Sequence, residues 1–392
     1  MHGVLRLAKC FDKARLKLAR VSSVGVFIPE IDGLRFLAIA SVVLFHLNGY
    51  ILAKIPQVKV DDPVSVVLVE VFKQGGVGVQ VFFAISGFIL ALPFAKFHFE
   101  QGPRVSLSRY FLRRLTRLEP PYLVNLILCF SLLVMFRGES FDQLLPHFAA
   151  SALYVHNIWF GDGSLINYPA WSLEIEVQFY ILLPLVAGLF SIRNNSVRRM
   201  IVLGIIGVSI VAQEWKLVSE LSVFQYIQFF LLGFVMADAY LMNWKSCPKK
   251  SYLWDCVSLM AWMGIILVQV HDVMKPVLLP LFVLLAFSGA FLGVYTNRLL
   301  CNRWVVTVGG MCYTIYLYHY LILSFVGRWF ITHLQGWPYW LCWLAMAPLI
   351  LSVVFVSSSI LFLFLEKPFM HRDWYIKLWG WISQVRSNEK GI

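Results

Sequence analysis

Long apolar stretches, separated by short polar segments, recur along the whole chain of 392 residues. A membrane-spanning helix needs roughly 20 predominantly apolar residues, because each residue advances about 1.5 Å through a hydrocarbon layer about 30 Å thick. The intervening segments are too short for a separately folded soluble domain. The pattern predicts an all-α polytopic membrane bundle of ten helices, at about 33–53, 75–95, 120–137, 171–191, 199–213, 222–241, 252–270, 276–296, 306–331 and 339–365.

The loops between these predicted helices differ in charge. Of the 33 Lys and Arg residues, 25 fall in alternate loops, and two, Arg35 and Arg328, lie inside predicted helices. Because cytoplasmic loops carry an excess of Lys and Arg, this asymmetry predicts cytoplasmic N- and C-termini. Residues 138–170 are then an outer-side element that can re-enter the membrane if it packs against protein. The prediction divides the chain into a basic cytoplasmic N-terminal arm (1–30), a transmembrane domain (31–366) and a cytoplasmic C-terminal tail (367–392).

Composition supports a membrane protein. The chain is 59% hydrophobic and 14% charged, whereas soluble domains contain about 25% charged residues. The net charge of +12 comes from short basic clusters between apolar segments, so membrane topology explains it better than nucleic-acid binding does. The N-terminus has no apolar core before residue 24, and we therefore expect no cleaved signal peptide. Seven cysteines without a CxxC pair or zinc-like spacing predict neither a disulfide framework nor a metal site.

Two ionisable residues, Arg35 and His46, lie in the first predicted helix, where hydrocarbon makes them costly. They are eleven residues apart, which places them on one helix face about 16 Å from each other, so each needs its own partner. Asp32, one turn from Arg35, can supply an ion pair. A neutral histidine can accept a proton from an attacking hydroxyl near neutral pH. An interhelical hydrogen bond would explain His46 equally well from its position alone.

A second polar group begins the fourth predicted helix, in the segment WSLEIEVQFY (171–180). Glu174 and Gln178 share one helix face, and Glu176 and Tyr180 share another, about 160° away. One pair can therefore face a cavity while the other contacts a helix or lipid headgroups. A carboxylate at this depth could orient the His46 ring. Stabilisation by the helix dipole would account for both glutamates without a catalytic role.

A third polar group lies at the cytoplasmic mouth of the third predicted helix. Arg114 and Arg117 are three residues apart there, and such a pair can bind phosphates through bidentate hydrogen bonds. Simple anchoring at the cytoplasmic interface explains the pair as well. Pro120 and Pro121 suit the first turn of the helix that follows.

The remaining polar positions are in the second, ninth and tenth predicted helices. Ser86-Gly87 permits close contact between helices, and we do not expect Ser86 to be a nucleophile. Tyr316 and His319 share a face and could line a polar cavity, or could simply pack among aromatic side chains. Glu366 ends the last helix at the inner interface, where a carboxylate costs little.

Taken together, these segments resemble the acyltransferase 3 family of integral membrane acyltransferases, which O-acylate cell-surface polysaccharides, lipopolysaccharide O-antigen, peptidoglycan and some small molecules. The resemblance extends over the whole chain. It rests on IDGLRFLAIASVVLFH (31–46), which carries the family's Arg and His with ten residues between them, and on FFAISGF (82–88), RRLTR (113–117), WSLEIEVQFY (171–180), YTIYLYH (313–319) and the terminal EKP (366–368).

The resemblance implies an O-acetyltransferase in the bacterial inner membrane, with acetyl-CoA as acyl donor, no metal, and O-antigen or exopolysaccharide as carbohydrate acceptor. It implies that His46 and Arg35 are catalytic and that one glutamate of WSLEIE assists them, with Glu176 preferred over Glu174. The remaining implied site residues are Arg113, Arg114 and Arg117 for the cofactor, and Asp32, Ser86, Trp171, Tyr316 and His319 for the substrate.

The implied path starts at the cytoplasmic arginines, where CoA would bind, and passes Arg35 to reach His46. His46 would be either a general base or a transient acyl carrier, and the sequence leaves both routes open. Many relatives carry a C-terminal SGNH hydrolase-like domain, whereas this chain ends about 25 residues after the last predicted helix. We therefore expect either direct transfer to the acceptor or a separate transfer partner.

The chief alternative is a transporter or flippase of a lipid-linked glycan or small solute. In that case Arg35 and His46 would hold substrate or protons inside the membrane. Many such proteins contain inverted repeats with matching broken helices. The sequence shows neither feature clearly.

Overall fold

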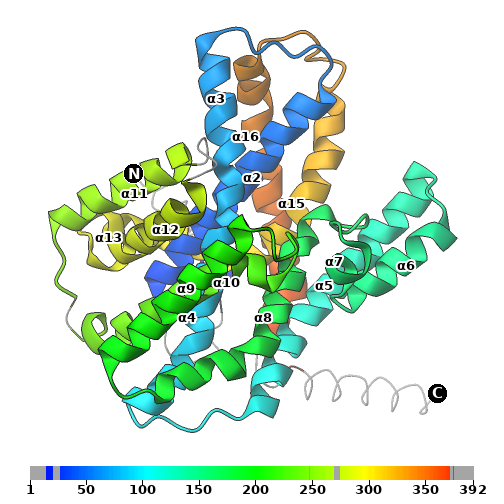
Figure 1. The fold of residues 1–392 in the computed structure, drawn as a ribbon. Helices are drawn as coiled ribbons and strands as arrows, with labels where there is room; N and C mark the ends of the chain where they lie inside the picture. The colour runs from blue at the N-terminus through cyan, green and yellow to red at the C-terminus, as the bar shows by residue number, and fades with distance from the viewer. Residues whose placement is uncertain (1–14, 21–26, 247, 269–273, 371–373, 375–392) are drawn as a thin grey trace, which may run out of the picture.

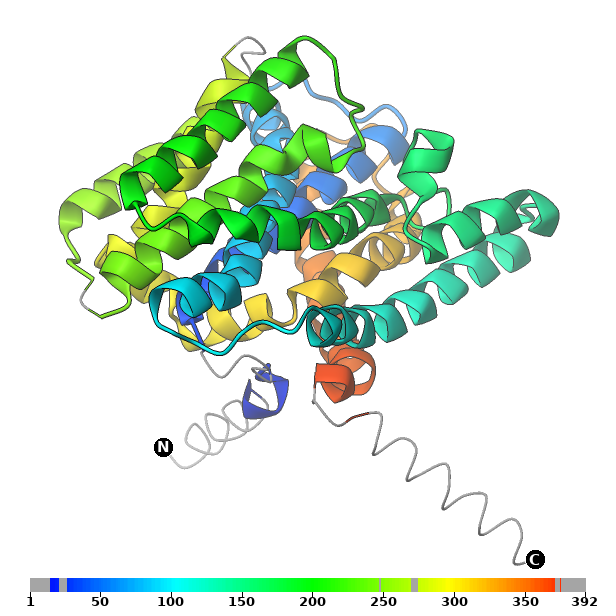
Figure 2. The ribbon, with the colours of Figure 1, turned by 60° about the horizontal axis from the view of Figure 1, so that its bottom comes forward.

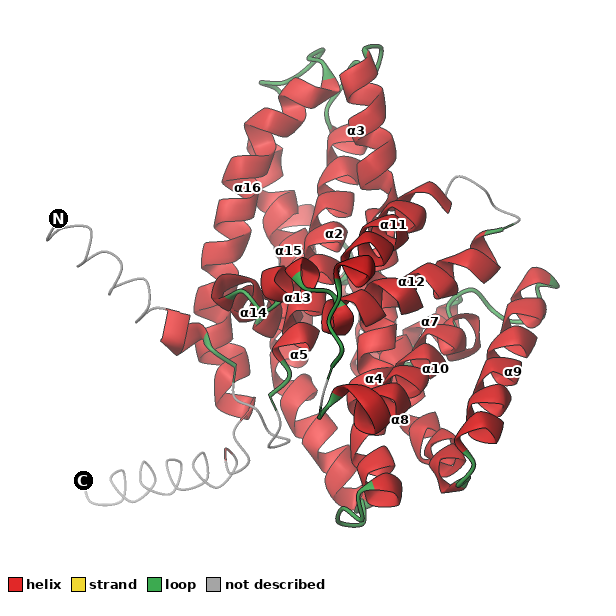
Figure 3. Cartoon of the chain, turned by 90° about the vertical axis from the view of Figure 1, so that its left-hand side faces the viewer, coloured by secondary structure: helices red, strands yellow, loops and turns green. Residues whose placement is uncertain are grey.

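The computed structural model describes residues 15–20, 27–246, 248–268, 274–370 and 374, and every regular element in this part of the chain is a helix (Figures 1 and 3). Most of the predicted N-terminal arm and C-terminal tail lie outside the described residues. The α-helices are α2 (Pro29–Lys54), α3 (Pro63–Lys73), α4 (Gly78–Phe99), α5 (Leu107–Arg137), α6 (Phe141–Ala152), α7 (His156–Phe160), α8 (Trp171–Ala187), α9 (Asn195–Glu214), α10 (Val223–Ala239), α11 (Tyr252–Val268), α12 (Lys275–Leu292), α13 (Tyr295–Leu300), α14 (Arg303–Gly310), α15 (Cys312–Gly327) and α16 (Tyr339–Leu361).

Short helical segments of other pitch join or extend these helices. Four of them continue directly from α3, α8, α10 and α15, and two follow α16 in succession. They are η1 (Gln74–Val77), η2 (Tyr168–Ala170), η3 (Gly188–Ser191), η4 (Tyr240–Trp244), η5 (Arg328–Phe330), η6 (Phe362–Glu366) and η7 (Lys367–Met370). Together with α3, η1 and α4 form one continuous apolar rod from Pro63 to Phe99.

All ten predicted membrane segments are helical, but not all are uninterrupted spans. Within the described residues, eight helices are long and apolar enough to cross a membrane. The ninth segment is a bent pair, Arg303–Gly310 with Cys312–Phe330, whose halves meet at 70°. The seventh predicted segment contains α11, of which 17 residues are described. The described residues thus contain eight candidate spans, or nine if the bent pair is one span, against the ten predicted.

The bend between α14 and α15 has a local cause. A Cβ atom on Gly309 would lie 1.7 Å from the carbonyl oxygen of Asp32, so only glycine allows α14 to pack this closely against α2. Glycine is also a weak helix former, and a second glycine, Gly310, follows directly. The chain therefore leaves α14 at Met311 and starts α15 in a new direction.

The helix α2 occupies the centre of the bundle. It packs against α3, α4, α14, α15 and α16, so segments from both ends of the chain meet around it (Figure 1). The closest pairing elsewhere is between α4 and α10. A Cβ on Gly87 would lie 2.0 Å from the carbonyl oxygen of Phe230, and one on Gly233 would lie 2.3 Å from that of Ala84. The prediction that Ser86-Gly87 permits close helix contact is confirmed.

Two expectations about the third span and the segment after it have different outcomes. The predicted helix start at Pro120 is wrong, because α5 begins at Leu107 and contains both prolines in its interior. Residues 107–119 contain no glycine or proline to end a helix, so Arg113, Arg114 and Arg117 belong to α5 itself. Within 138–170, the short helices α6 and α7 pack against α5 and α8, and none is long enough to span (Figure 1).

Residues 15–20 and 367–370 lie at the same end of the bundle (Figure 2). The ammonium group of Lys367 donates to the carbonyl of Lys17, and Leu18 is 8% exposed within a cluster that includes Met370. Arg20 then pairs with Asp32 at the start of α2. Arg117 of α5 reaches the same end, where it lies 3.9 Å from Glu366, the residue before Lys367.

Candidate active site

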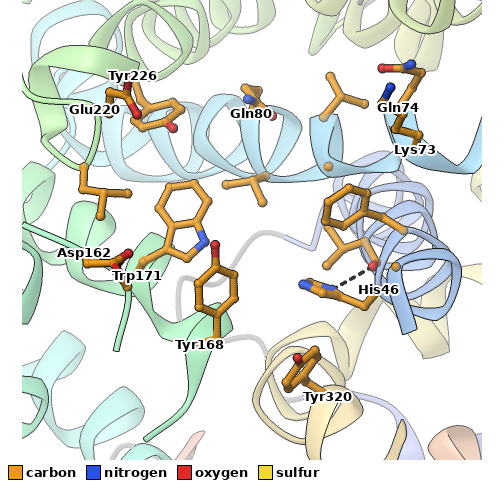
Figure 4. Close-up of a pocket in the computed structure, with 18 of the residues that line it drawn as sticks. His46, Lys73, Gln74, Gln80, Asp162, Tyr168, Trp171, Glu220, Tyr226 and Tyr320 are labelled. Carbon is orange, nitrogen blue, oxygen red and sulfur yellow. Dashed lines mark hydrogen bonds between the residues drawn. The ribbon is translucent and has the colours of Figure 1, made fainter. Parts of the chain in front are cut away.

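His46 lies on α2 opposite α15, where it meets a second histidine. Its Nδ1 atom is 3.0 Å from the carbonyl oxygen of Val42 and 3.1 Å from Nε2 of His319. The two ring centroids are 5.0 Å apart, and Tyr320 lies edge-on to His46 (Figure 4). The predicted interhelical hydrogen bond of His46 therefore exists, and its partner is an imidazole rather than the expected carboxylate.

The hydrogen bonds define which nitrogen of each neutral ring carries the proton. Nδ1 of His319 is 3.0 Å from the carbonyl oxygen of Ile315 and 2.8 Å from that of Tyr316. Carbonyl oxygens only accept, so His319 Nδ1 must donate, and its Nε2 is then an acceptor. His46 Nδ1–H donates to that acceptor and to Val42. The lone pair on Nε2 of His46 therefore remains available, because none of the described residues donates a hydrogen bond to it.

His46 lines a large cavity, which we call the histidine cavity. Its volume is about 840 Å³, and its wall combines aromatic, amide and charged side chains (Figure 4). It is formed by α2, η1, the start of α8 and the loop at 161–163. A volume of this size is typical of sites for small organic molecules.

Arg35 lines a different and narrower cavity of about 110 Å³, which we call the arginine cavity. Arg114 and Arg117 of α5 also line it, and Glu176 is the one carboxylate in its described wall. Arg35 is paired with Asp32, and Arg117 lies 3.9 Å from Glu366. Arg114 is therefore the guanidinium group of this wall without an ion pair among the described residues, and it favours an anionic ligand.

The two cavities adjoin one another close to His46. Val42 and Val79 contribute to the walls of both, and Val42 is one helical turn from His46 on α2. Trp171 lines the histidine cavity, and the next residue, Ser172, lines the arginine cavity. The arrangement provides two chemically different approaches to one region of the bundle.

The predicted ion pair between Asp32 and Arg35 is confirmed, with 2.7 Å between Asp32 Oδ1 and an Arg35 terminal nitrogen. Arg20 approaches the same oxygen at 2.8 Å, a contact that sequence reasoning missed. The Asp32 side chain is only 3% exposed. It lies behind the wall of the arginine cavity and holds Arg35 in place, so it does not itself line the expected substrate path.

The two glutamates of α8 occupy distinct environments. Glu176 lines the arginine cavity, and its Oε1 accepts hydrogen bonds of 2.6 Å from both Ser86 and Tyr180. Glu174 is fully buried, and its Oε2 accepts a 2.8 Å hydrogen bond from the backbone N–H of Asn157. The predicted division of this segment into a cavity-facing pair and a packing pair is confirmed for Glu176 and Glu174.

The arginines of α5 also differ from one another. Arg114 lies 5.7 Å from the Tyr180 ring centroid, in a cation–π contact at the cavity wall. Arg117 lies 3.9 Å from Glu366, and its Nε atom has no hydrogen-bond partner among the described residues. Arg113 is exposed and lines neither cavity.

Glu366 is not at an inexpensive interfacial position, contrary to the prediction. It is fully buried, and Oε2 accepts from the backbone and the hydroxyl of Thr314 at 3.1 and 2.5 Å. The π-helical segment η6 turns this carboxylate inward toward α15 and Arg117. Sequence reasoning underestimated Glu366 because its partners lie far away along the chain.

Of the other four expected substrate residues, three line one cavity or the other, whereas His319 lines neither. Trp171 is in the wall of the histidine cavity. Tyr316 lines the arginine cavity, where its hydroxyl is 3.1 Å from Ser172 Oγ and donates to the carbonyl of Pro169 at 2.5 Å. Ser86 lines it as well, through the hydrogen bond to Glu176.

A histidine pair outside the spans supports the loop at 161–163. His147 Nδ1 is 2.8 Å from His156 Nε2, and His156 Nδ1 is 3.1 Å from the carbonyl of Asp162. Burial lowers the pKa of His156, although the Asp162 carbonyl opposes the shift. The pair therefore holds in place a loop that forms part of the histidine cavity.

Comparison with known proteins gives a consistent family assignment. A family model described as an acyltransferase domain (Acyl_transf_3) matches residues 28–360. A Staphylococcus aureus (strain COL) protein named "Putative O-acetyltransferase SACOL0978" is 24% identical over 387 residues, which cover 91% of this chain and 59% of that protein. O-acetyltransferase OatA of S. aureus (strain NCTC 8325) is 24% identical over 335 residues, 78% of this chain and 52% of OatA.

The chain thus spans between half and three fifths of the length of these relatives. No solved structure matches the chain significantly. Among the described residues, no group of three or more His, Cys, Asp or Glu side chains is arranged to hold a metal ion.

Proposed function

Because the chain belongs to the acyltransferase 3 family, we propose that it is a membrane-embedded O-acyltransferase. It transfers an acyl group from cytoplasmic acyl-CoA to a hydroxyl of a cell-surface carbohydrate, such as O-antigen or exopolysaccharide, in the bacterial inner membrane. Acetyl is the expected acyl group, since the relatives are named O-acetyltransferases. The observation that carries the proposal is the junction of two chemically different cavities beside His46.

The arginine cavity is the donor side in this proposal. Arg114 and Arg117 bind the phosphates of acyl-CoA, because guanidinium groups form charge-assisted, bidentate hydrogen bonds with phosphate oxygens. The cavity is too narrow for the nucleotide, so the slender pantetheine arm is the part that enters it. Arg35, held by Asp32, lines this path between the arginines and His46.

The histidine cavity is the acceptor side. The Nε2 lone pair of His46 takes the proton of the acceptor hydroxyl while the hydroxyl oxygen attacks the acyl carbonyl carbon. The carbon–sulfur bond then breaks, the electron pair leaves with the CoA sulfur, and the proton on His46 neutralises the thiolate. His319 is a positioning residue, because it accepts the Nδ1–H of His46 and so keeps the lone pair on Nε2.

Glu176 is the glutamate that we assign to the site. It faces the donor path with two short hydrogen bonds, from Ser86 and Tyr180. Glu174 instead holds the start of α7 against α8 and lines neither cavity. Glu174 is therefore structural in this proposal.

The decisive experiment incubates purified protein in nanodiscs with radiolabelled acetyl-CoA and surface-glycan fragments. The measured quantity is the label transferred to the glycan. Replacement of His46 by Ala should lower transfer of label to glycan by roughly 10²–10⁴-fold, the usual contribution of a general base. Replacement of the exposed His333 by Ala is the matched control and should leave transfer unchanged. Wild-type transfer in the His46→Ala protein would overturn the mechanism. In proteoliposomes, movement of glycan across the membrane without acetylation would favour the transporter instead.

Two further measurements separate the roles of the histidines. Label retained on the protein when glycan is omitted would indicate an acyl-histidine intermediate rather than direct transfer. His319→Ala should lower kcat and alter its pH profile, because His46 loses the acceptor for its Nδ1–H. His319→Gln should restore part of the rate, since the amide oxygen can accept the same hydrogen bond.

A further inference from the structure

The outer half of the predicted bundle contains few basic residues, and they are unevenly placed. Its loops hold six Lys and Arg residues, at positions 54, 59, 73, 137, 216 and 275. Three of these six, Lys54, Lys73 and Lys275, line the histidine cavity. They come from the end of α2, the end of α3 and the start of α12, so only the tertiary structure brings them to one cavity.

These lysines have little compensation from nearby carboxylates. Lys73 lies 4.0 Å from Glu70, a distance at which an exposed pair contributes little. Among the described residues, no carboxylate forms an ion pair with Lys54 or Lys275. Positive charge in a concave site raises the local concentration of anions.

Charge is segregated within the histidine cavity. Lys73 and Gln74 lie on the same side of the cavity as His46 (Figure 4). Asp162 and Glu220 lie on the opposite side, next to Trp171 and Tyr226 (Figure 4). Aromatic faces and carboxylates together are suited to a sugar ring, which stacks through its C–H face and donates hydrogen bonds from its hydroxyls.

We propose that Lys54, Lys73 and Lys275 form a subsite for an acidic group, a carboxylate or a phosphate, on the acceptor carbohydrate. The inference rests on the proposed function and deepens it by naming the acceptor class. A neutral sugar binds on the aromatic side, and the acidic group binds beside His46. The acylated hydroxyl therefore belongs to the acidic residue of the glycan or to the one next to it.

The test compares three acceptors: an oligosaccharide with a uronic acid, the same oligosaccharide with its carboxyl group reduced to an alcohol, and a glycosyl phosphate. The triple variant Lys54→Gln, Lys73→Gln, Lys275→Gln removes the subsite. Lys59→Gln with Lys216→Gln is the matched control, because these outer lysines do not line the cavity. The control variant shows whether loss of positive charge from the outer loops, away from the cavity, changes the kinetics by itself.

We expect wild-type protein to favour an acidic acceptor over the reduced one by at least about tenfold in kcat/KM, a preference that falls with added salt. The triple variant should lose this preference through a higher KM, with kcat for the reduced acceptor unchanged. The control variant should keep the preference. Comparison of the uronic acid with the glycosyl phosphate identifies which acid the subsite takes.

Binding to the His46→Ala protein, measured by calorimetry, tests the subsite without acyl transfer. Lysine-dependent binding of an acidic oligosaccharide in this variant would support the subsite even if no acetylation occurs, which separates it from the proposed function. Equal use or binding of the acidic and reduced oligosaccharides by wild-type protein would overturn the inference. Lysine-dependent retention of anionic lipid, with no binding of acidic glycan, would overturn it in favour of a lipid site.

Discussion

At the scale of single residues, the site depends on how each costly polar group is held. Asp32 fixes Arg35, and His319 fixes the His46 ring, so the two groups have separate partners as their spacing on α2 requires. Glu174 and Glu176 are two residues apart, yet Glu174 is buried and caps α7, whereas Glu176 faces the arginine cavity. A short stretch of one helix thus supplies both a structural and a functional carboxylate.

The arginines of α5 provide a residue-scale prediction. Arg114→Ala should raise the KM for acyl-CoA by roughly ten- to a hundredfold, because a charge-assisted hydrogen bond contributes about 1.5–3 kcal/mol. Arg113→Ala is the matched control, since this neighbouring side chain is exposed and lines neither cavity. Steady-state kinetics with varied acetyl-CoA give the comparison. Equal KM values for the two variants would remove the arginine cavity from donor binding.

At the scale of elements, small residues determine how closely the helices pack around the site. Gly87 and Gly233 bring α4 and α10 together, which positions Ser86 beside Glu176. Gly309 brings α14 against the start of α2, and the resulting bend lets α15 place His319 opposite His46. Side chains at the site are therefore placed by backbone contacts outside it.

Gly87→Ala should destabilise the protein by about 1–3 kcal/mol, because the added methyl group overlaps the Phe230 carbonyl and the helices must separate. Gly207→Ala in α9 is the control, since a Cβ there meets no atom within 4 Å. Alanine is the better helix former, so the control should be neutral or slightly stabilised. Thermal unfolding in detergent measures both. Equal midpoints for the two variants would show that this contact does not limit stability.

At the scale of the whole molecule, the two cavities approach the site from opposite ends of the bundle. Arg117 of α5 lies 3.9 Å from Glu366, at the end where Lys367 contacts Lys17, and the lysine-lined cavity opens beside His46. We propose that the first end is cytoplasmic, on the distribution of Lys and Arg between the loops. Acyl donor and acceptor would then reach the reaction centre from different compartments.

Cysteine accessibility tests this orientation in a variant whose seven native cysteines are replaced. A membrane-impermeant maleimide should label Lys216→Cys in intact cells and label Lys249→Cys only after permeabilisation. Both positions are exposed, so burial does not limit the reaction. The opposite labelling pattern would invert the bundle and place the arginine cavity outside.

The sequence by itself determined the features that depend on local spacing. Apolar length predicted where the helices lie, three-residue spacing predicted the Asp32–Arg35 pair, and the residues of α8 already separated into two faces. These contacts lie within one helix, whose geometry follows from the backbone alone. The sequence was misleading at the start of α5, because Pro120 and Pro121 suited a helix start yet lie inside the helix.

Only the tertiary structure decided the partners that lie far apart along the chain. His46 meets His319, Ser86 meets Glu176, and Glu366 is buried against Thr314. The three lysines of the histidine cavity come from three different helices. Such pairings depend on how helices cross, and small residues such as Gly87 and Gly309 determine those crossings through contacts that no local pattern specifies.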